Sequence, residues 1–116
     1  MKTLKIPERW VESKYNKKLT IMEHQLMIHS LGYLSDHAIK GLTPKSSILN
    51  INEFLKLCYG EKKFGGTYYK SIRNSLKKLS EKMIIDSYEI DSGVLSISFK
   101  TCFIESIYGS GNIFRI

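Results

Sequence analysis

The chain has 116 residues, of which 42% are hydrophobic and 25% are charged. This length suits one domain with a modest core, and the composition argues against an intrinsically disordered chain. The formal net charge of +7 favours an anionic partner, nucleic acid first and a membrane surface second.

Other features of the sequence argue against export and membrane insertion. No apolar run approaches the roughly 20 residues of a membrane span, and the N-terminus lacks the apolar core of a signal peptide. Only Cys58 and Cys102 are present, far apart and outside any CxxC pattern. We therefore expect two free thiols and a cytoplasmic protein.

Residues 1–18 are predicted to form a basic lead-in with a short helix after Pro7, anchored by Trp10. Residues 19–116 are predicted to form the folded domain. Its first helix begins with a capping box, Thr20-Ile21-Met22-Glu23. This helix is apolar around most of its girth, so we expect it to be enclosed by the core and by a second subunit. Only a narrow arc is expected to stay polar, with Gln25, His29, Gly32 and Asp36.

Shorter elements follow. Gly41 and Pro44 indicate a loop over Lys40–Lys45. Ser47–Ile51 is predicted to be a strand, after which Asn52 caps a helix over Glu53–Tyr59. Gly60 is a natural end for that helix, and Glu61–Gly66 is the turn that follows.

A basic amphipathic helix is predicted over Thr67–Met83. Apolar residues recur at helical spacing on one face: Ile72, Leu76, Leu79 and Met83. Lys70, Asn74, Lys77 and Glu81 lie opposite, flanked by Arg73 and Lys78. One face of this helix therefore packs, and the other presents cations and an amide.

A two-strand hairpin is predicted next, over Ile84–Ile90 and Val94–Lys100, with the turn at Asp91–Gly93. Leu95, Ile97 and Phe99 alternate with polar residues and should face the core. Their phase allows the second strand to run on to Phe103, before a helical turn over Ile104–Tyr108. A closing strand is expected over Ile113–Ile116.

The order helix, strand, helix, turn, helix, strand, strand predicts an α+β winged helix-turn-helix fold, a three-helix core with a short β-hairpin wing. The basic helix would enter the major groove, where Lys70, Arg73, Asn74 and Lys77 read bases, while Lys62, Lys63 and Thr67 hold phosphates. The full set of expected contacts to double-stranded DNA is Lys62, Lys63, Thr67, Tyr68, Lys70, Arg73, Asn74, Lys77, Lys78, Ser92 and Gly93. The alternative is a solvated basic face on an ordinary helix.

No catalytic or metal site is expected. Tyr68-Tyr69 superficially resembles a DNA-cleaving tyrosine, but that chemistry needs a metal held by closely spaced histidines. His24 and His29 point roughly 140° apart on a helix, and His37 adds no His-x-His pair. We expect one tyrosine to pack and the other to contact phosphate, with no cofactor and no enzymatic activity.

Three segments, Lys18–Leu31, Leu49–Leu57 and Tyr69–Leu79, resemble the N-terminal winged-helix domain of plasmid replication initiator (Rep) proteins. The shared patterns are "Leu-Thr-x-x-Glu-x-x-Leu", an apolar strand running into "Glu-Phe-x-x-Leu", and "Tyr-x-x-Ile/Leu-x-x-Ala-x-x-x-Leu". Ser75 stands where the last pattern has alanine. The resemblance implies a domain that dimerises and makes secondary DNA contacts, while a second winged helix reads most of the bases.

That second domain is not in this sequence. The chain is therefore expected to be either a fragment of an initiator or a standalone plasmid factor for conjugative transfer, partition or copy control. We expect a homodimer that occupies DNA sites and recruits replication or transfer proteins, with no membrane partner. The alternatives are a winged-helix transcriptional repressor, or a protein–protein interaction module that docks through the apolar first helix and Trp10.

Overall fold

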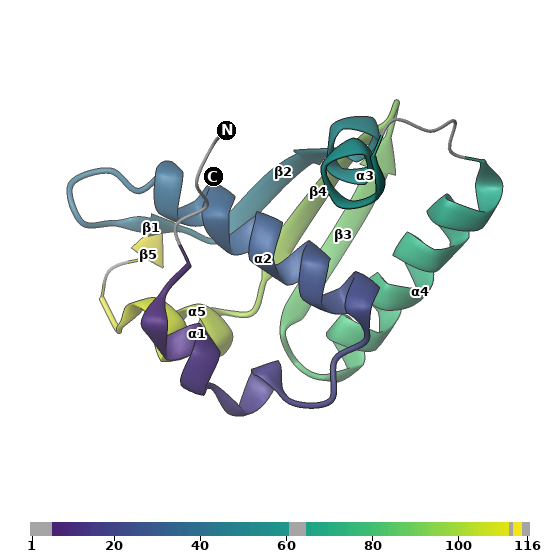
Figure 1. Ribbon diagram of the computed structural model, residues 1–116. Helices are drawn as coiled ribbons and strands as arrows, with labels where there is room; N and C mark the ends of the chain where they lie inside the picture. Colours follow the sequence, from purple (N-terminus) through teal and green to yellow (C-terminus); the bar gives the residue numbers. More distant parts are fainter. Residues whose placement is uncertain (1–5, 61–64, 112, 115–116) are drawn as a thin grey trace.

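Helix α2 (Ile21–Asp36) runs through the middle of the molecule and crosses one face of a three-stranded antiparallel sheet (Figure 1). This computed structural model describes residues 6–60, 65–111 and 113–114. Helix α4 (Gly66–Glu81) lies along one side of the molecule, whereas α1 (Glu8–Glu12) and α5 (Thr101–Tyr108) pack together on the other (Figure 1). The fold is α+β, and one cluster of buried apolar side chains joins its parts.

The capping box at the start of α2 is present as predicted. The Thr20 hydroxyl accepts a hydrogen bond from the Glu23 backbone N–H at 3.2 Å, and the Glu23 carboxylate accepts one from the Thr20 N–H at 3.3 Å. The predicted polar arc of this helix is partly wrong. Gly32 is buried, and the His29 ring is half-buried, edge-on to Phe54 with 5.2 Å between ring centroids.

The Glu23 carboxylate also ties α2 to the end of α4. Lys82 donates a hydrogen bond to Glu23 Oε1 at 2.8 Å, and the Thr20 hydroxyl donates one to Oε2 at 2.6 Å. Burial raises the pKa of Glu23, but these donors and the Lys82 charge outweigh it, so the pKa lies below its ordinary value. The buried carboxylate is therefore charged, and both of its oxygens accept hydrogen bonds.

Strand β4 (Val94–Phe99) lies between β2 (Ser46–Asn50) and β3 (Ile85–Asp91). Leu95, Ile97 and Phe99 are buried and Ser96 is exposed, which confirms the predicted alternation. The hairpin turn is Ser92–Gly93, with φ of 51° and 78°. Positive φ at both positions is typical of the tight turns whose twist matches that of paired strands.

Helix α3 (Ile51–Tyr59) begins two residues earlier than predicted. The side chain of Asn50, not of Asn52, caps it, accepting a hydrogen bond from the Glu53 N–H at 3.0 Å. The Ile51 N–H donates to the Gly93 carbonyl at 2.9 Å, so the hairpin turn is held against the start of this helix. Gly60 ends α3 with φ of 82°, as predicted.

Three other predictions are wrong. The strand does not run on to Phe103, because α5 begins at Thr101 and Phe103 packs against Trp10 and Tyr15 at centroid distances of 6.1 and 5.2 Å. Met83 is 54% exposed with φ of 65°, because α4 has already ended at Glu81. The predicted loop over Lys40–Lys45 contains β1 (Thr43–Pro44), which pairs in parallel with β5 (Ile113–Phe114).

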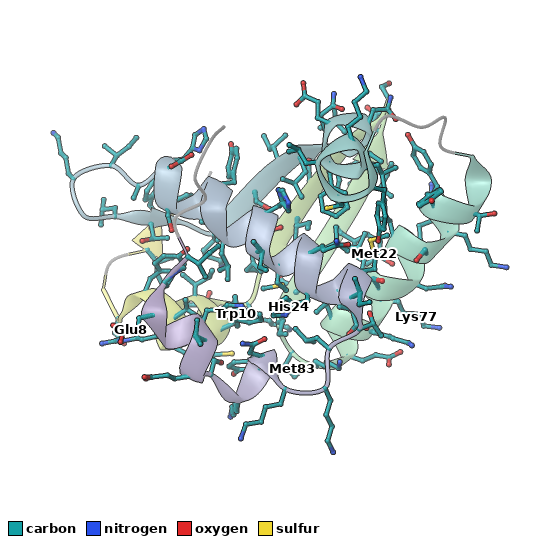
Figure 2. The ribbon with its side chains drawn as sticks, in the orientation of Figure 1. Glu8, Trp10, Met22, His24, Lys77 and Met83 are labelled. Carbon is teal, nitrogen blue, oxygen red and sulfur yellow. The ribbon has the colours of Figure 1, made fainter. Side chains whose placement is uncertain are left out.

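The predicted anchoring of the N-terminal segment is confirmed. Trp10 on α1 is 1% exposed and belongs to the core cluster, and the short 3-10 helix η1 (Lys14–Asn16) follows it. Figure 2 shows Trp10 beside His24 of α2, and their ring centroids lie 6.4 Å apart. In the part of the chain that the structure describes, no helix has the length and apolar character needed to cross a membrane.

The Glu23–Lys82 pair predicts a measurable stability difference. Lys82→Ala leaves the buried carboxylate without its cation and should lower the free energy of unfolding by about 2 kcal/mol, less than the ~3–5 kcal/mol of a fully buried pair. The expected loss is smaller than for a fully buried pair because the Lys82 side chain is 36% exposed, so solvent partly screens its charge. Urea denaturation provides the measurement.

The matched control is Lys100→Ala, which removes an ion pair at 3.3 Å whose carboxylate, on Asp86, is 56% exposed, in contrast to the buried carboxylate of Glu23. That variant should lose less than about 1 kcal/mol. Equal losses in the two variants would contradict the role given to the buried carboxylate.

Candidate nucleic-acid interface

Helix α4 is held by its apolar face against α2 and β3. Ile72, Leu76 and Leu79 are completely buried, and the small side chain of Ser75 is buried between them and α2. This packing fixes which side of the helix meets solvent, because residues three and four apart share a face. The exposed side is therefore set by the core.

The exposed side of α4 is mainly basic, with Glu81 as its one acidic residue. At about 100° per residue, six of the predicted DNA contacts fall within one arc of roughly 140°. All six are exposed: Thr67, Lys70, Arg73, Asn74, Lys77 and Lys78. Figure 2 shows the labelled Lys77 pointing away from the body of the protein. We call these six residues the basic arc.

The cations of the basic arc are available to a ligand. Glu81 is the one carboxylate on α4, against four lysine and arginine side chains. Among the ion pairs of the described residues, none involves Lys70, Arg73, Lys77 or Lys78. The arc therefore combines unneutralised positive charge with one amide that can both donate and accept hydrogen bonds.

An open groove of about 520 Å³ runs between the start of α2 and the basic arc. Four arc residues line it from α4, and Thr20, Ile21 and Met22 line it from α2. Glu23 also lines this groove, but Lys82 neutralises its carboxylate. Arc residues on this flank are Thr67, Lys70, Asn74 and Lys78, while Arg73 and Lys77 lie farther round the helix.

Both tyrosines at the start of α4 are half-buried against the core cluster. The Tyr68 ring lies 5.4 Å from that of Tyr59, between centroids, on the packed side of the helix. Both rings therefore pack against the protein, and the DNA contact of Tyr68 remains a prediction. Lys62 and Lys63, also predicted contacts, lie outside the described residues.

The hairpin that was predicted to touch DNA carries negative charge. Strand β3 holds Asp86, Glu89 and Asp91, and no lysine or arginine occurs between Ile85 and Phe99. The turn residues Ser92 and Gly93 follow directly, and the Gly93 carbonyl is occupied by the Ile51 N–H. Carboxylates repel phosphates, although Lys100 pairs with one of these, Asp86, at 3.3 Å. The DNA contact of Ser92 and Gly93 stays a prediction.

A second cavity, of about 240 Å³, lies between α2 and α3 and is lined in part by His29. Cys58 Sγ is 3.8 Å from His29 Nε2, a contact that sequence reasoning missed. Burial raises the pKa of the Cys58 thiol and lowers the pKa of the His29 imidazole. Both shifts favour neutral partners, the opposite of a thiolate–imidazolium nucleophile.

The three histidines have separate surroundings. His24 lies beside Trp10, His29 beside Phe54, and the His37 ring stacks on Tyr33 with 3.9 Å between centroids. Among the described residues, no group of histidine, cysteine, aspartate or glutamate side chains is arranged to hold a metal ion. Comparisons with protein-family models, curated proteins and solved structures found no match for this chain.

The lowered pKa of His29 predicts an acid-sensitive fold. The unfolded chain takes up a proton near the ordinary histidine pKa, about 6.5, whereas the folded chain resists it, so stability falls as pH drops through this range. The urea midpoint should therefore decrease between about pH 7.5 and about pH 5.5. Glu23, with its lowered pKa, contributes only at more acid pH.

In His29→Gln this decrease should shrink. A His29→Gln protein with an unchanged pH dependence would show that the acid sensitivity comes from another group.

Proposed function

We propose that this chain is a sequence-specific double-stranded DNA-binding protein of the winged helix-turn-helix type, and that the basic arc of α4 is its DNA-reading surface. The observation that carries the proposal is the arc itself: four cations without ion-pair partners among the described residues, and one amide, on a single exposed helix face. An exposed helix of this kind suits the major groove of B-DNA, which is about 12 Å wide.

The architecture supports this proposal. The chain runs α2, β2, α3, α4, β3, β4, with the strands in the order β2-β4-β3. In helix-turn-helix proteins the second helix of the motif enters the major groove while the first crosses the backbone. We assign α3 and α4 to those places, and α2 packs against α4 and contacts α3 through the Gln25–Tyr59 hydrogen bond and the His29–Phe54 ring pair.

Roles within the arc follow from side-chain chemistry. Arg73, or Lys77 beside it, can donate hydrogen bonds to guanine, and Asn74 can pair with the donor and acceptor edge of adenine. Thr67 and the N–H groups at the start of α4 suit phosphate, because helix N-termini attract anions. Binding then acts by occupying sites and recruiting partners, without a chemical step.

A role on a plasmid or other mobile element, in replication, transfer or partition, belongs to this proposal and rests on the Rep-like sequence patterns. Homodimerisation is part of it, because two-fold DNA sites are read by symmetric pairs. A chromosomal transcriptional repressor would use the same surface.

One observation favours a second candidate, a protein-interaction module. Leu57 on α3 is 74% exposed and Ile48 on β2 is 48% exposed, and both line the cavity between α2 and α3. Exposed apolar side chains beside a cavity are typical of protein-binding surfaces. This surface is distinct from the basic arc, so the two candidates can be tested separately.

Selection of bound duplexes from a random pool at physiological salt tests the proposed function. We expect enrichment of a defined motif, repeated or two-fold symmetric, and its genomic position would indicate the process served. An unenriched pool would reject sequence-specific binding and favour the protein-interaction candidate.

Substitutions in the arc should separate base reading from phosphate binding. Arg73→Ala should cost about 1–3 kcal/mol at its cognate base pair and relax preference there. Lys78→Ala should weaken all sequences alike, and Lys40→Ala, at the opposite end of the molecule, is the control. Equal losses on every sequence for Arg73→Ala would show that this side chain does not read a base.

A further inference from the structure

A second basic groove, of about 630 Å³, lies where the N-terminal segment passes the end of α4. Four lysines line it: Lys14, Lys17, Lys18 and Lys82. Its apolar part comes from Tyr15, Met83 and Cys102. Among the residues that the structure describes, none that lines this groove is acidic.

The backbone that carries these lysines is held against the core. Trp10 is buried just before it, and the Tyr15 ring packs edge-on against Phe103 at a centroid distance of 5.2 Å. The Ser13 hydroxyl accepts a hydrogen bond from the Tyr15 N–H at 3.0 Å. Lys82 donates to the Lys18 carbonyl at 3.2 Å, which fixes the far end of the segment to the end of α4. The lysines are thus presented from an ordered segment.

The positive charge of the groove is largely uncompensated. Lys82 is balanced by Glu23 at 2.8 Å, but Lys14, Lys17 and Lys18 are exposed and form no ion pair among the described residues. Lys14 lies over the Tyr15 ring at 5.3 Å, a contact that leaves its ammonium free to meet an anion. Exposed ammonium groups of this kind are phosphate-binding groups in nucleic-acid complexes.

The groove adjoins the basic arc. Lys82 directly follows the last residues of α4 and contacts Lys18, and Lys78 lies one helical turn before it. An anion that occupied both surfaces would have to be extended, with charges repeated along its length. The sugar–phosphate backbone of nucleic acid has this character.

We propose that the groove formed by Lys14, Lys17, Lys18 and Lys82 binds backbone phosphates of the same duplex that the basic arc reads. This inference rests on the proposed function and extends it, because it assigns the N-terminal segment as a second, sequence-independent anchor. The anchor fixes how the duplex runs across the protein and leaves the acidic hairpin away from it.

Cys102 gives a direct test, because it is an exposed free thiol that lines the groove. We expect a saturating duplex to slow alkylation of Cys102 several-fold, measured residue by residue by mass spectrometry. Cys58, half-buried between α2 and α3, is the internal reference and should react at an unchanged rate.

The outcomes distinguish the two proposals. Duplex binding in a gel-shift assay with unprotected Cys102 would overturn the anchor and leave the proposed function standing. No binding of any duplex would overturn both. Protection of Cys102 by vesicles of anionic phospholipid, with none by duplex, would contradict the anchor and assign the groove to a lipid surface.

Charge-removing variants provide a second readout. Lys14→Ala combined with Lys17→Ala should weaken binding to all duplexes equally. Each lost phosphate contact should flatten the dependence of log affinity on log salt by about 0.9. Lys40→Ala, in the connection between α2 and β1 at the other end of the molecule, should change neither quantity (Figure 1). An unchanged salt slope in the double variant would overturn the anchor.

Discussion

A buried carboxylate links the end of the basic helix to the start of α2. Glu23 caps the first turn of α2 through Thr20 and holds Lys82 at the end of α4, while Lys82 also holds the Lys18 carbonyl. Two parts of the chain that are distant in sequence, Lys18–Glu23 and Lys82, therefore meet at this ion pair. A buried ion pair contributes little net stability, but its geometry is demanding, because an unpaired buried charge is costly. In this protein it joins the end of α4 to the start of α2, and Lys82 also joins both to the N-terminal segment.

Charge is divided unevenly over the surface. The N-terminal lysines adjoin the basic arc at the end of α4, whereas β3 carries three carboxylates, of which Asp86 is paired with Lys100. A field of this kind orients an approaching polyanion before contact, since several charges of one sign act together over about a Debye length, ~8–10 Å in physiological salt. The proposed phosphate anchor therefore lies on the basic side of this division, in the N-terminal groove.

Local patterns predicted most of the fold. The Thr20–Glu23 capping box, the apolar spacing of Ile72, Leu76 and Leu79, and the alternation in β4 all lie within a few residues, so their consequences could be predicted directly. The outward positions of Lys70, Arg73, Asn74 and Lys77 followed from the same spacing. Whether these side chains bind DNA is a separate question that packing does not answer.

The errors came from interactions between distant residues. Asn50 caps α3 because the hairpin turn accepts the Ile51 N–H, a contact across more than forty positions of the chain. The position of Phe103 in the sequence is compatible with the alternation of a strand and also with the helical spacing of Ile104 and Ile107. In the structure Phe103 is helical and packs against Trp10 and Tyr15. The lysine groove could not be predicted from the sequence either, because it depends on a hydrogen bond between Lys82 and Lys18, which are 64 positions apart.

We have proposed that α4 presents a DNA-binding surface. Backbone amide NMR during titration with a short duplex tests it most directly, because a protein of 13.4 kDa gives residue-resolved spectra. The account predicts salt-sensitive shift changes concentrated on the exposed residues of α4 and on the segment Lys14–Lys18, with little change in β3. Changes confined to the surface around Ile48 and Leu57, or none at all, would contradict it.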